Sequence, residues 1–236
     1  MSLHLCWLLF VSSRVSKLLT VPEAQSVHLR LATAVDLPLL ASIHKQAYSR
    51  MHFTALLRNE TLERYYGYFL SDGSEVLLAV KQDADGEETA LGFAVHGRGI
   101  PERIALFKRE ASRDILMTSL RYPLPAFRKL TFALWSRLIA GAACKPTDFL
   151  LLSIAVRHKG GGVGGCLLRA MLEGAQKDLA QKVGLYVNAD NLNAINAYFA
   201  AGFVMRHYLY GQFYMEADCQ ATKSTDRTNF SINAIW

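Results

Sequence analysis

An apolar run, a glycine-rich turn and an amphipathic segment follow one another between positions 148 and 180, and this succession constrains the fold more than any other feature. Residues 148–156 are almost continuously apolar, which predicts a strand buried on both faces. Five glycines then fill six positions from Gly160 to Gly165. Glycine inside a helix or strand costs about 0.5–1 kcal/mol relative to alanine, so this run predicts a turn. A helix should follow from about 162 to 180, and the succession indicates an α/β fold.

The predicted turn has the properties of an anion-binding site. Glycines let the backbone approach a ligand closely, and the start of the following helix adds partial positive charge, which suits a pyrophosphate. Arg157, His158 and Lys159 add further positive charge. The chain has no Gly-Lys-Ser/Thr loop, and it matches the dinucleotide pattern only because its glycines are redundant. A surface turn that binds nothing stays open as the alternative.

The remaining elements alternate between strands and helices around this segment. Pro38 behind Asp36 marks the start of a helix, and the Asp-Ala-Asp-Gly sequence at 83–86 marks a hairpin turn. The pattern predicts strands at 27–31, 75–81, 89–96, 183–187, 203–208 and 212–216, and helices at 36–48, 59–70 and 191–201. A meander at the front followed by strands alternating with helices indicates a mixed sheet.

Residues 98–147 differ in character from the rest and are interpreted as an inserted helical pair. They carry ten basic against three acidic residues, a balance of +7 that exceeds the +6 of the whole chain. One helix is expected to begin near Pro101 and a second to lie around Phe127, with residues 122–125 between them. The apolar face around Trp135 and Leu138 is compatible with a dimer seam, with a membrane-surface foot, or with packing on the core.

Composition narrows the class of protein. The 236 residues are 51% apolar and 19% charged, which is typical of a globular protein and argues against a disordered one. The net charge favours anionic partners such as a phosphorylated cofactor, a nucleic acid or an anionic membrane. The four cysteines form no CxxC pair and no ligand cluster with histidines, so we expect reduced thiols, no bound metal and a cytoplasmic location.

The two ends are expected to lie outside the folded domain. Residues 1–25 are interpreted as a leader of uncertain structure, because the apolar run at 3–11 is too short to cross a bilayer. The domain is expected to span 26–218, with a tail at 219–236. We do not expect membrane contact through 1–20 or 124–143.

A second motif, at residues 185–203, follows the glycine turn. A strand ends, Asn191 heads a short helix, Ala194 and Tyr198 follow three and seven residues later, and Gly202-Phe203 closes the segment. These residues and spacings resemble the second conserved motif of the GNAT acyltransferase superfamily.

Two further segments resemble the same superfamily. Lys159, Gly162 and Gly164 are similar to its coenzyme A loop, although Lys159 stands where arginine or glutamine is usual and Val156 where proline is common. The opening segment with Arg30, Ala32 and Asp36 is similar as well. The resemblance covers about 27–97 and 148–217 and leaves out the basic insertion.

The resemblance implies a GNAT-like α/β fold, in which helices flank a mixed, mostly antiparallel sheet, here with a helical insertion. It also implies an acetyltransferase that uses acetyl-CoA as co-substrate and moves the acetyl group to a primary amine of a small molecule or amino sugar by direct attack. The backbone of Ile154, Ala155 and Val156 would bind the pantetheine arm, and Asn191 would touch that arm. The pyrophosphate would be held by the amides of Lys159, Gly160, Gly161, Gly162, Val163, Gly164 and Gly165.

Catalytic roles follow partly from chemistry. The thiolate that leaves has a conjugate acid with a pKa of about 8.5, so a tyrosine can protonate it, and the resemblance places Tyr198 beside the sulfur. A core aromatic is the alternative role for Tyr198, and a helix cap is the alternative for Asn191. The base stays open among His96, Glu75, Glu102, Asp148 and a water chain. His96 is the residue selected here, although a histidine at a strand end is often a surface residue.

Other functions are not excluded by these residues. A non-catalytic acyl-CoA sensor would keep the loop and lack the base. Nucleic-acid binding through the basic insertion would require stacking aromatic residues, which are sparse there, so no nucleic acid is expected. We expect a small-molecule amine acceptor, with an anionic acceptor favoured by the basic insertion, and a homodimer is compatible with the sequence.

Overall fold

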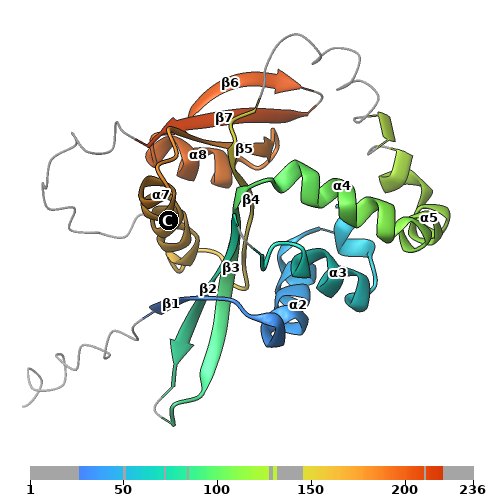
Figure 1. Ribbon diagram of the computed structural model, residues 1–236, viewed down its shortest axis with the longest axis horizontal. Coiled ribbons are helices and arrows are strands. Elements are labelled where there is room, and N and C mark those ends of the chain that lie inside the picture. Colours follow the sequence, from blue (N-terminus) through green and yellow to red (C-terminus); the bar gives the residue numbers. More distant parts are fainter. Residues whose placement is uncertain are drawn as a thin grey trace, which may run out of the picture.

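A single sheet of seven strands organises the chain, in the order β1-β2-β3-β4-β5-β7-β6 (Figure 1). Every neighbouring pair is antiparallel except β4 and β5, which run parallel. The strands are β1 (Val27–Leu31), β2 (Ser74–Gln82), β3 (Glu88–Arg98), β4 (Phe149–Val156), β5 (Lys182–Asn188), β6 (Val204–Leu209) and β7 (Gln212–Asp218). The mixed, mostly antiparallel sheet is the one expected from the sequence.

This computed structural model describes residues 27–49, 52–71, 73–83, 85–127, 130–131, 146–209 and 211–219. The leader at 1–25, the tail from 220 onward and the apolar face around Trp135 and Leu138 lie outside these ranges. Within them, no helix has the length and apolar character needed to cross a membrane.

The helices cover both faces of the sheet. In Figure 1, α2 and α3 lie on one side, next to α4 and α5, and α7 lies on the other. The helical elements are η1 (Ala34–Asp36), α2 (Leu37–Ala47), η2 (Phe53–Leu56), α3 (Asn59–Gly67), α4 (Ile100–Glu110), α5 (Ser112–Arg121), α7 (Val163–Lys177) and α8 (Leu192–Ala200).

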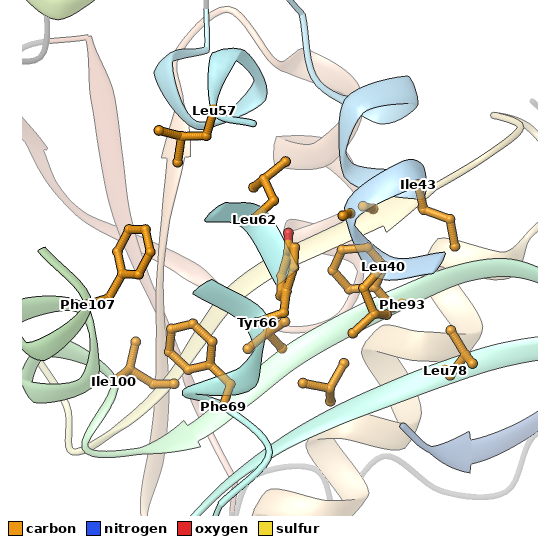
Figure 2. Packing of buried hydrophobic residues seen from close by; sticks show 14 of the residues in the cluster. Leu40, Ile43, Leu57, Leu62, Tyr66, Phe69, Leu78, Phe93, Ile100 and Phe107 are labelled. Carbon is orange, nitrogen blue, oxygen red and sulfur yellow. The ribbon is translucent and has the colours of Figure 1, made fainter. Parts of the chain in front are cut away.

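Two apolar cores follow from this arrangement. The α2–α3 side packs around fully buried Tyr66, Phe69 and Phe93, which Figure 2 shows among leucines of several elements. On the α7 side, Leu167 and Met171 pack against the opposite face of the sheet. Alternation along the central strands supplies both cores, because successive side chains point to opposite faces.

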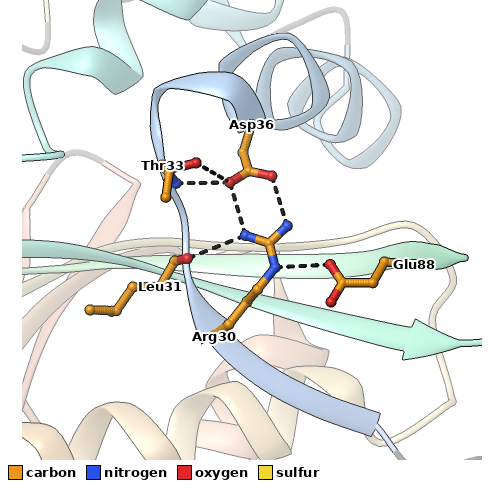
Figure 3. A network of polar contacts seen from close by, with 5 residues as sticks. All are labelled: Arg30, Leu31, Thr33, Asp36 and Glu88. Carbon is orange, nitrogen blue, oxygen red and sulfur yellow. Dashed lines mark hydrogen bonds and ion pairs between the residues drawn. The ribbon is translucent and has the colours of Figure 1, made fainter. Parts of the chain in front are cut away.

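The start of α2 is fixed to the sheet by one ionic network (Figure 3). Arg30 on β1 donates to both carboxylate oxygens of Asp36, at 2.9 and 2.8 Å, and its Nε donates to Glu88 at 3.0 Å. The backbone N–H of Thr33 also donates to Asp36, at 2.8 Å. The Arg30 guanidinium beside Asp36 lowers the pKa of that buried carboxyl to about 2. The network therefore holds η1 and α2 against β1 as long as Asp36 is ionised.

The parallel strands β4 and β5 separate part-way along their length. They pair only from Phe149 to Leu151 on β4 and from Val183 to Leu185 on β5. Beyond this point β4 stays paired with β3 on its other side, and β5 stays paired with β7. A register shift between Val95 and His96 marks the same region of the sheet. The chain therefore forms a fork between β4 and β5 that opens toward the glycine turn.

The basic insertion differs in detail from its prediction. The first helical stretch is interrupted at Ala111, where ψ is 17°, so that α4 and α5 are separate helices. Helical residues resume directly at Pro123 after Tyr122, whereas the sequence suggested a longer break at 122–125. Proline is well suited to the first turn of a helix, because the amide hydrogen that it lacks would have no partner there.

Candidate functional site

The glycine turn lies between the end of β4 and the start of α7. Gly162 is the N-cap of α7 and has a φ of 72°, and Gly160 has a φ of 90°. These left-handed conformations favour glycine. A Cβ added at Gly160, Gly161 or Gly162 would meet no atom within 4 Å. The turn is thus bordered by open space, and the first N–H groups of α7 have no partner within their helix.

The three basic residues before the glycines, Arg157, His158 and Lys159, have different surroundings. The Arg157 backbone N–H donates to Leu91 at 2.8 Å, and its guanidinium donates to Gln46 of α2 at 3.4 Å. His158 and Lys159 are exposed. Arg157 therefore ties the turn to β3 and α2, and the two exposed side chains border the open space.

The α8 segment brings the second motif to the other arm of the fork. Asn191 caps α8, because its Oδ1 accepts from the Ala194 N–H at 3.3 Å. The Tyr198 ring is partly buried and lies 5.6 Å from the ring of Phe203. Burial raises the pKa of the Tyr198 hydroxyl, and nearby Tyr48 raises it further. Tyr198 is therefore a neutral hydroxyl that can donate a proton.

Ser153 lies on β4 at the fork, and tyrosines surround it. Its Oγ is buried and makes no hydrogen bond of ordinary geometry with the described residues. Burial raises the pKa of Tyr48 to about 12, and the adjacent Ser153 hydroxyl lowers it in part. Tyr66 also has its pKa raised by burial and, to a lesser extent, by Tyr48, with the Ser153 hydroxyl acting in the opposite direction. Three hydroxyl groups thus gather on the α2–α3 side of the fork.

Histidines extend this polar group away from the sheet. His44 of α2 bonds the Tyr66 hydroxyl through Nδ1 at 2.5 Å and Thr54 Oγ1 through Nε2 at 2.9 Å. Thr54 Oγ1 in turn lies 2.8 Å from Nδ1 of His52. The His44 ring also lies against Tyr48, with ring centroids 4.4 Å apart. Histidine and hydroxyl side chains of this kind can carry protons.

His96 lies elsewhere on the sheet. Its ring is 3% exposed, stacks on Phe149 at 5.8 Å, and has no hydrogen-bond partner on either nitrogen among the described residues. Burial lowers its pKa to about 4. It lines a cavity of about 350 Å³ with Glu75 and Asp178, which follows the last residue of α7. His96 is therefore near the C-terminal end of α7, whereas the glycine turn is at its N-terminal end.

The structure thus brings the glycine turn, the separated end of β4 and the α8 motif to the open end of the fork. Asn191 fills the capping role that the sequence left open. The other base candidates do not gather there: Glu75 lies beside His96, and Glu102 lies in the first turn of α4. Asp148 immediately precedes β4, at the end where β4 is paired with β5. Within the described residues, no group of three His, Cys, Asp or Glu side chains is placed to hold a metal.

Solved structures with this architecture supply a comparison. The PaiA N-acetyltransferase from Thermoplasma acidophilum, in complex with coenzyme A, has a TM-score of 0.52 at 16% identity, and the match covers 82% of this chain and 99% of that one. YncA from Salmonella typhimurium, solved with its cofactor acetyl-CoA, has a TM-score of 0.51 at 15% identity, covering 82% and 94%. No protein-family profile and no curated protein sequence matches the chain.

A third structure is a chimera that contains the spermidine N-acetyltransferase SpeG from Vibrio cholerae. It has a TM-score of 0.51 at 15% identity, and the match covers 84% of this chain and 98% of that one. Together with the fork in the sheet, these matches decide the architecture. The chain has the GNAT N-acetyltransferase fold.

Within the GNAT fold, sequence reasoning missed the polar group on the α2–α3 side. Its members come from separate elements: His44 from α2, Tyr48 directly after α2, Tyr66 from α3 and Ser153 from β4. One signal was present, because His44 and Tyr48 are four residues apart and so would share a face of the helix expected at 36–48. Their partners were not readable, since only the packing of α3 against α2 brings Tyr66 to His44.

Proposed function

We propose that the protein is an N-acetyltransferase that moves the acetyl group of acetyl-CoA to the primary amine of a small molecule. One observation carries this proposal: the fork between β4 and β5 opens beside a left-handed glycine turn at the start of α7. The fork leaves β4 backbone groups unpaired with β5, and the turn offers N–H groups and a helix dipole to a pyrophosphate. Coenzyme A needs both features, because it is a long pantetheine arm joined to a pyrophosphate.

The co-substrate would then contact the residues selected from the sequence. The backbone of Ile154, Ala155 and Val156 would hydrogen-bond the pantetheine arm, and Asn191 would approach the arm while capping α8. The amides from Lys159 to Gly165 would hold the pyrophosphate. The structures of PaiA and YncA, which contain coenzyme A and acetyl-CoA, support this placement through the shared fold.

The chemistry is a direct attack. The neutral amine nitrogen forms a bond to the thioester carbonyl carbon and gives a tetrahedral intermediate with a negatively charged oxygen. A backbone N–H of β4 at the fork would stabilise this oxyanion. The C–S bond then breaks, the nitrogen loses its extra proton as the amide forms, and the Tyr198 hydroxyl gives its proton to the thiolate. The proton released from the nitrogen restores the Tyr198 hydroxyl. The high pKa of Tyr198 keeps its own proton on the hydroxyl until the thiolate develops.

His96 stays a prediction as the general base. An imidazole with a pKa of about 4 is a weak acceptor for the proton of an alkylammonium ion, whose pKa is about 10. Its place at the far end of α7 also separates it from the glycine turn. His96→Gln should therefore be compared with variants on the α2–α3 side.

The acceptor is defined here only as a small primary amine. SpeG acetylates spermidine according to its name, but spermidine is a cation, and the insertion of this chain is basic. We therefore favour a primary amine whose other groups are neutral or anionic, such as an amino sugar, over a polyamine. A cytoplasmic location and a homodimer stay predictions.

The proposal is tested by a free-thiol assay with acetyl-CoA and a panel of primary amines that includes amino sugars, alkylamines and benzylamine. Tyr198→Phe should lower kcat by about 100-fold, the usual contribution of an acid catalyst, while acetyl-CoA binding is retained. Tyr208→Phe, an exposed tyrosine on β6, is the matched control. Binding of acetyl-CoA without turnover of any amine would contradict the enzyme and favour the acyl-CoA sensor.

A further inference from the structure

A cavity of about 350 Å³ lies beside the C-terminal end of α7 and is separate from the glycine turn. It is lined by Gly73, Glu75, His96, Gly97, Arg98 and Asp178. These residues come from the segment at the start of β2, from the end of β3 and from the position that follows α7. Since a water molecule occupies about 30 Å³ in the liquid, the cavity has room for a small organic molecule. The proposed coenzyme site is at the opposite, N-terminal end of the same helix.

His96 is the most deeply buried side chain that lines this cavity. It is 3% exposed, whereas Glu75, Arg98 and Asp178 are exposed at the rim. Neither of its ring nitrogens has a hydrogen-bond partner among the described residues. Burial lowers its pKa to about 4, so near neutral pH the ring carries one N–H donor and one acceptor nitrogen. A buried polar group without a partner is unfavourable, which indicates that a molecule entering the cavity supplies the missing hydrogen bond.

Two carboxylates border the same cavity. Glu75 stands directly opposite His96 in the antiparallel pairing of β2 with β3, which puts their Cβ atoms about 5 Å apart on one face of the sheet. Arg98, two residues after His96, holds Asp178 close, because its guanidinium donates to the Asp178 carbonyl oxygen at 3.0 Å. In the part of the chain that the structure describes, neither carboxylate forms an ion pair. Both are therefore available to a ligand.

The charges at the cavity favour a cation. The lining side chains carry two carboxylates, Glu75 and Asp178, against the one guanidinium of Arg98, a balance of −1. The last turn of α7 adds the partial negative charge of a helix C-terminus. Lys177 and Arg103 lie nearby, but neither lines the cavity. A ligand that carries positive charge and N–H donors therefore complements these side chains.

We propose that this cavity binds a small alkylammonium ion. The three N–H groups of its head would donate to the Glu75 carboxylate, to the acceptor nitrogen of His96 and to the Asp178 carboxylate. Arg98 would act as a positioning residue, because its bond to the Asp178 carbonyl oxygen ties the end of α7 to β3. This inference is independent of the proposed acetyltransferase function, since it requires neither the fork nor the glycine turn.

The test uses two isomeric cations that differ in their N–H groups. Butylammonium has three N–H donors, whereas tetramethylammonium has the same composition and charge and no N–H donor. The full-length protein, without acetyl-CoA, carries isotope-labelled histidine, and the ring signal of His96 is followed by NMR during titration with each chloride salt. His96→Gln identifies that signal by its loss among the seven histidines. Because the signal reports this ring itself, binding at an acceptor site beside the fork is not mistaken for binding in the cavity.

Butylammonium should shift the His96 signal to saturation with a dissociation constant of about 1–10 mM, a modest affinity for so small a ligand, and tetramethylammonium should not shift it. Glu75→Gln and Asp178→Asn should each weaken binding about tenfold, since each removes one charge-assisted hydrogen bond. Glu173→Gln is the matched control, because it removes an exposed carboxylate of α7 that does not line the cavity, and it should change the dissociation constant by less than about twofold. Equal shifts by both cations, no shift by butylammonium up to about 50 mM, or saturation that neither cavity variant weakens would each overturn the site.

Discussion

Replacing Asp36 by asparagine removes the charge that fixes the start of α2, and the size of the effect follows from the structure. The folded pKa of Asp36 is about 2, against an ordinary value of 3.8. A difference of about 1.8 in pKa corresponds to about 2.4 kcal/mol. Because the folded pKa is lowered, this stability is fully present above about pH 4 and is lost as the pH falls toward 2. Asp36→Asn should therefore lower the free energy of unfolding at pH 7 by about 2 kcal/mol.

Urea unfolding followed by circular dichroism at pH 7, 4 and 2.5 measures this effect. The difference between parent and variant should shrink steadily below pH 4, since protonated Asp36 resembles asparagine. Glu88→Gln is the control, because it removes the other carboxylate that pairs with Arg30, and the Glu88 side chain is 43% exposed. An exposed ion pair contributes little, so this control should cost at most about 0.5 kcal/mol. Equal costs for the two variants, or an Asp36→Asn difference as large at pH 2.5 as at pH 7, would refute the reasoning.

The remaining predictions concern glycines at three kinds of position. Gly92→Ala should destabilise the fold by about 1–3 kcal/mol in urea unfolding, since its Cβ would lie 2.6 Å from the Ala155 carbonyl oxygen; an unchanged midpoint would contradict this contact. Gly174→Ala in α7 should raise the free energy of unfolding by about 0.5–1 kcal/mol, because the added Cβ meets nothing within 4 Å and alanine favours the helix. A loss of stability would show that the position is crowded. Gly161→Val should leave the unfolding midpoint unchanged and weaken acetyl-CoA binding at least tenfold in calorimetry, and unchanged binding would place the pyrophosphate elsewhere.

The sheet and most helices could be predicted from the sequence, because their signals are local. The apolar run at 149–156, the glycines after it and the alternation at 27–31 each set one element within a few residues. The helix expected at 59–70 ends earlier, at Gly67, where the chain turns toward β2. The break at Ala111 could not be predicted, because no proline or glycine marks it.

The residues of the site also fall into those that the sequence predicts and those that it does not. The glycine turn and the α8 motif are continuous in sequence, so their residues could be selected together. The row of hydrogen-bonded side chains from Tyr66 through His44 to His52 joins α3, α2 and the segment after α2, and nothing local marks those residues as partners. His96 was selected because it ends a strand, but strand alternation turns its ring toward Phe149 and the C-terminal end of α7.

Calorimetric titration with acetyl-CoA of the parent and of Gly162→Asp tests the central claim most directly. Gly162 has a φ of 72°, which aspartate tolerates better than most residues, and the new carboxylate would repel a pyrophosphate at the turn. Gly86→Asp is the matched control, since Gly86 has a φ of 80° in a hairpin turn with open space around it. The account predicts binding by the parent and by Gly86→Asp and no binding by Gly162→Asp. A parent that does not bind acetyl-CoA, or a Gly162→Asp variant that binds as tightly as the parent, would contradict it.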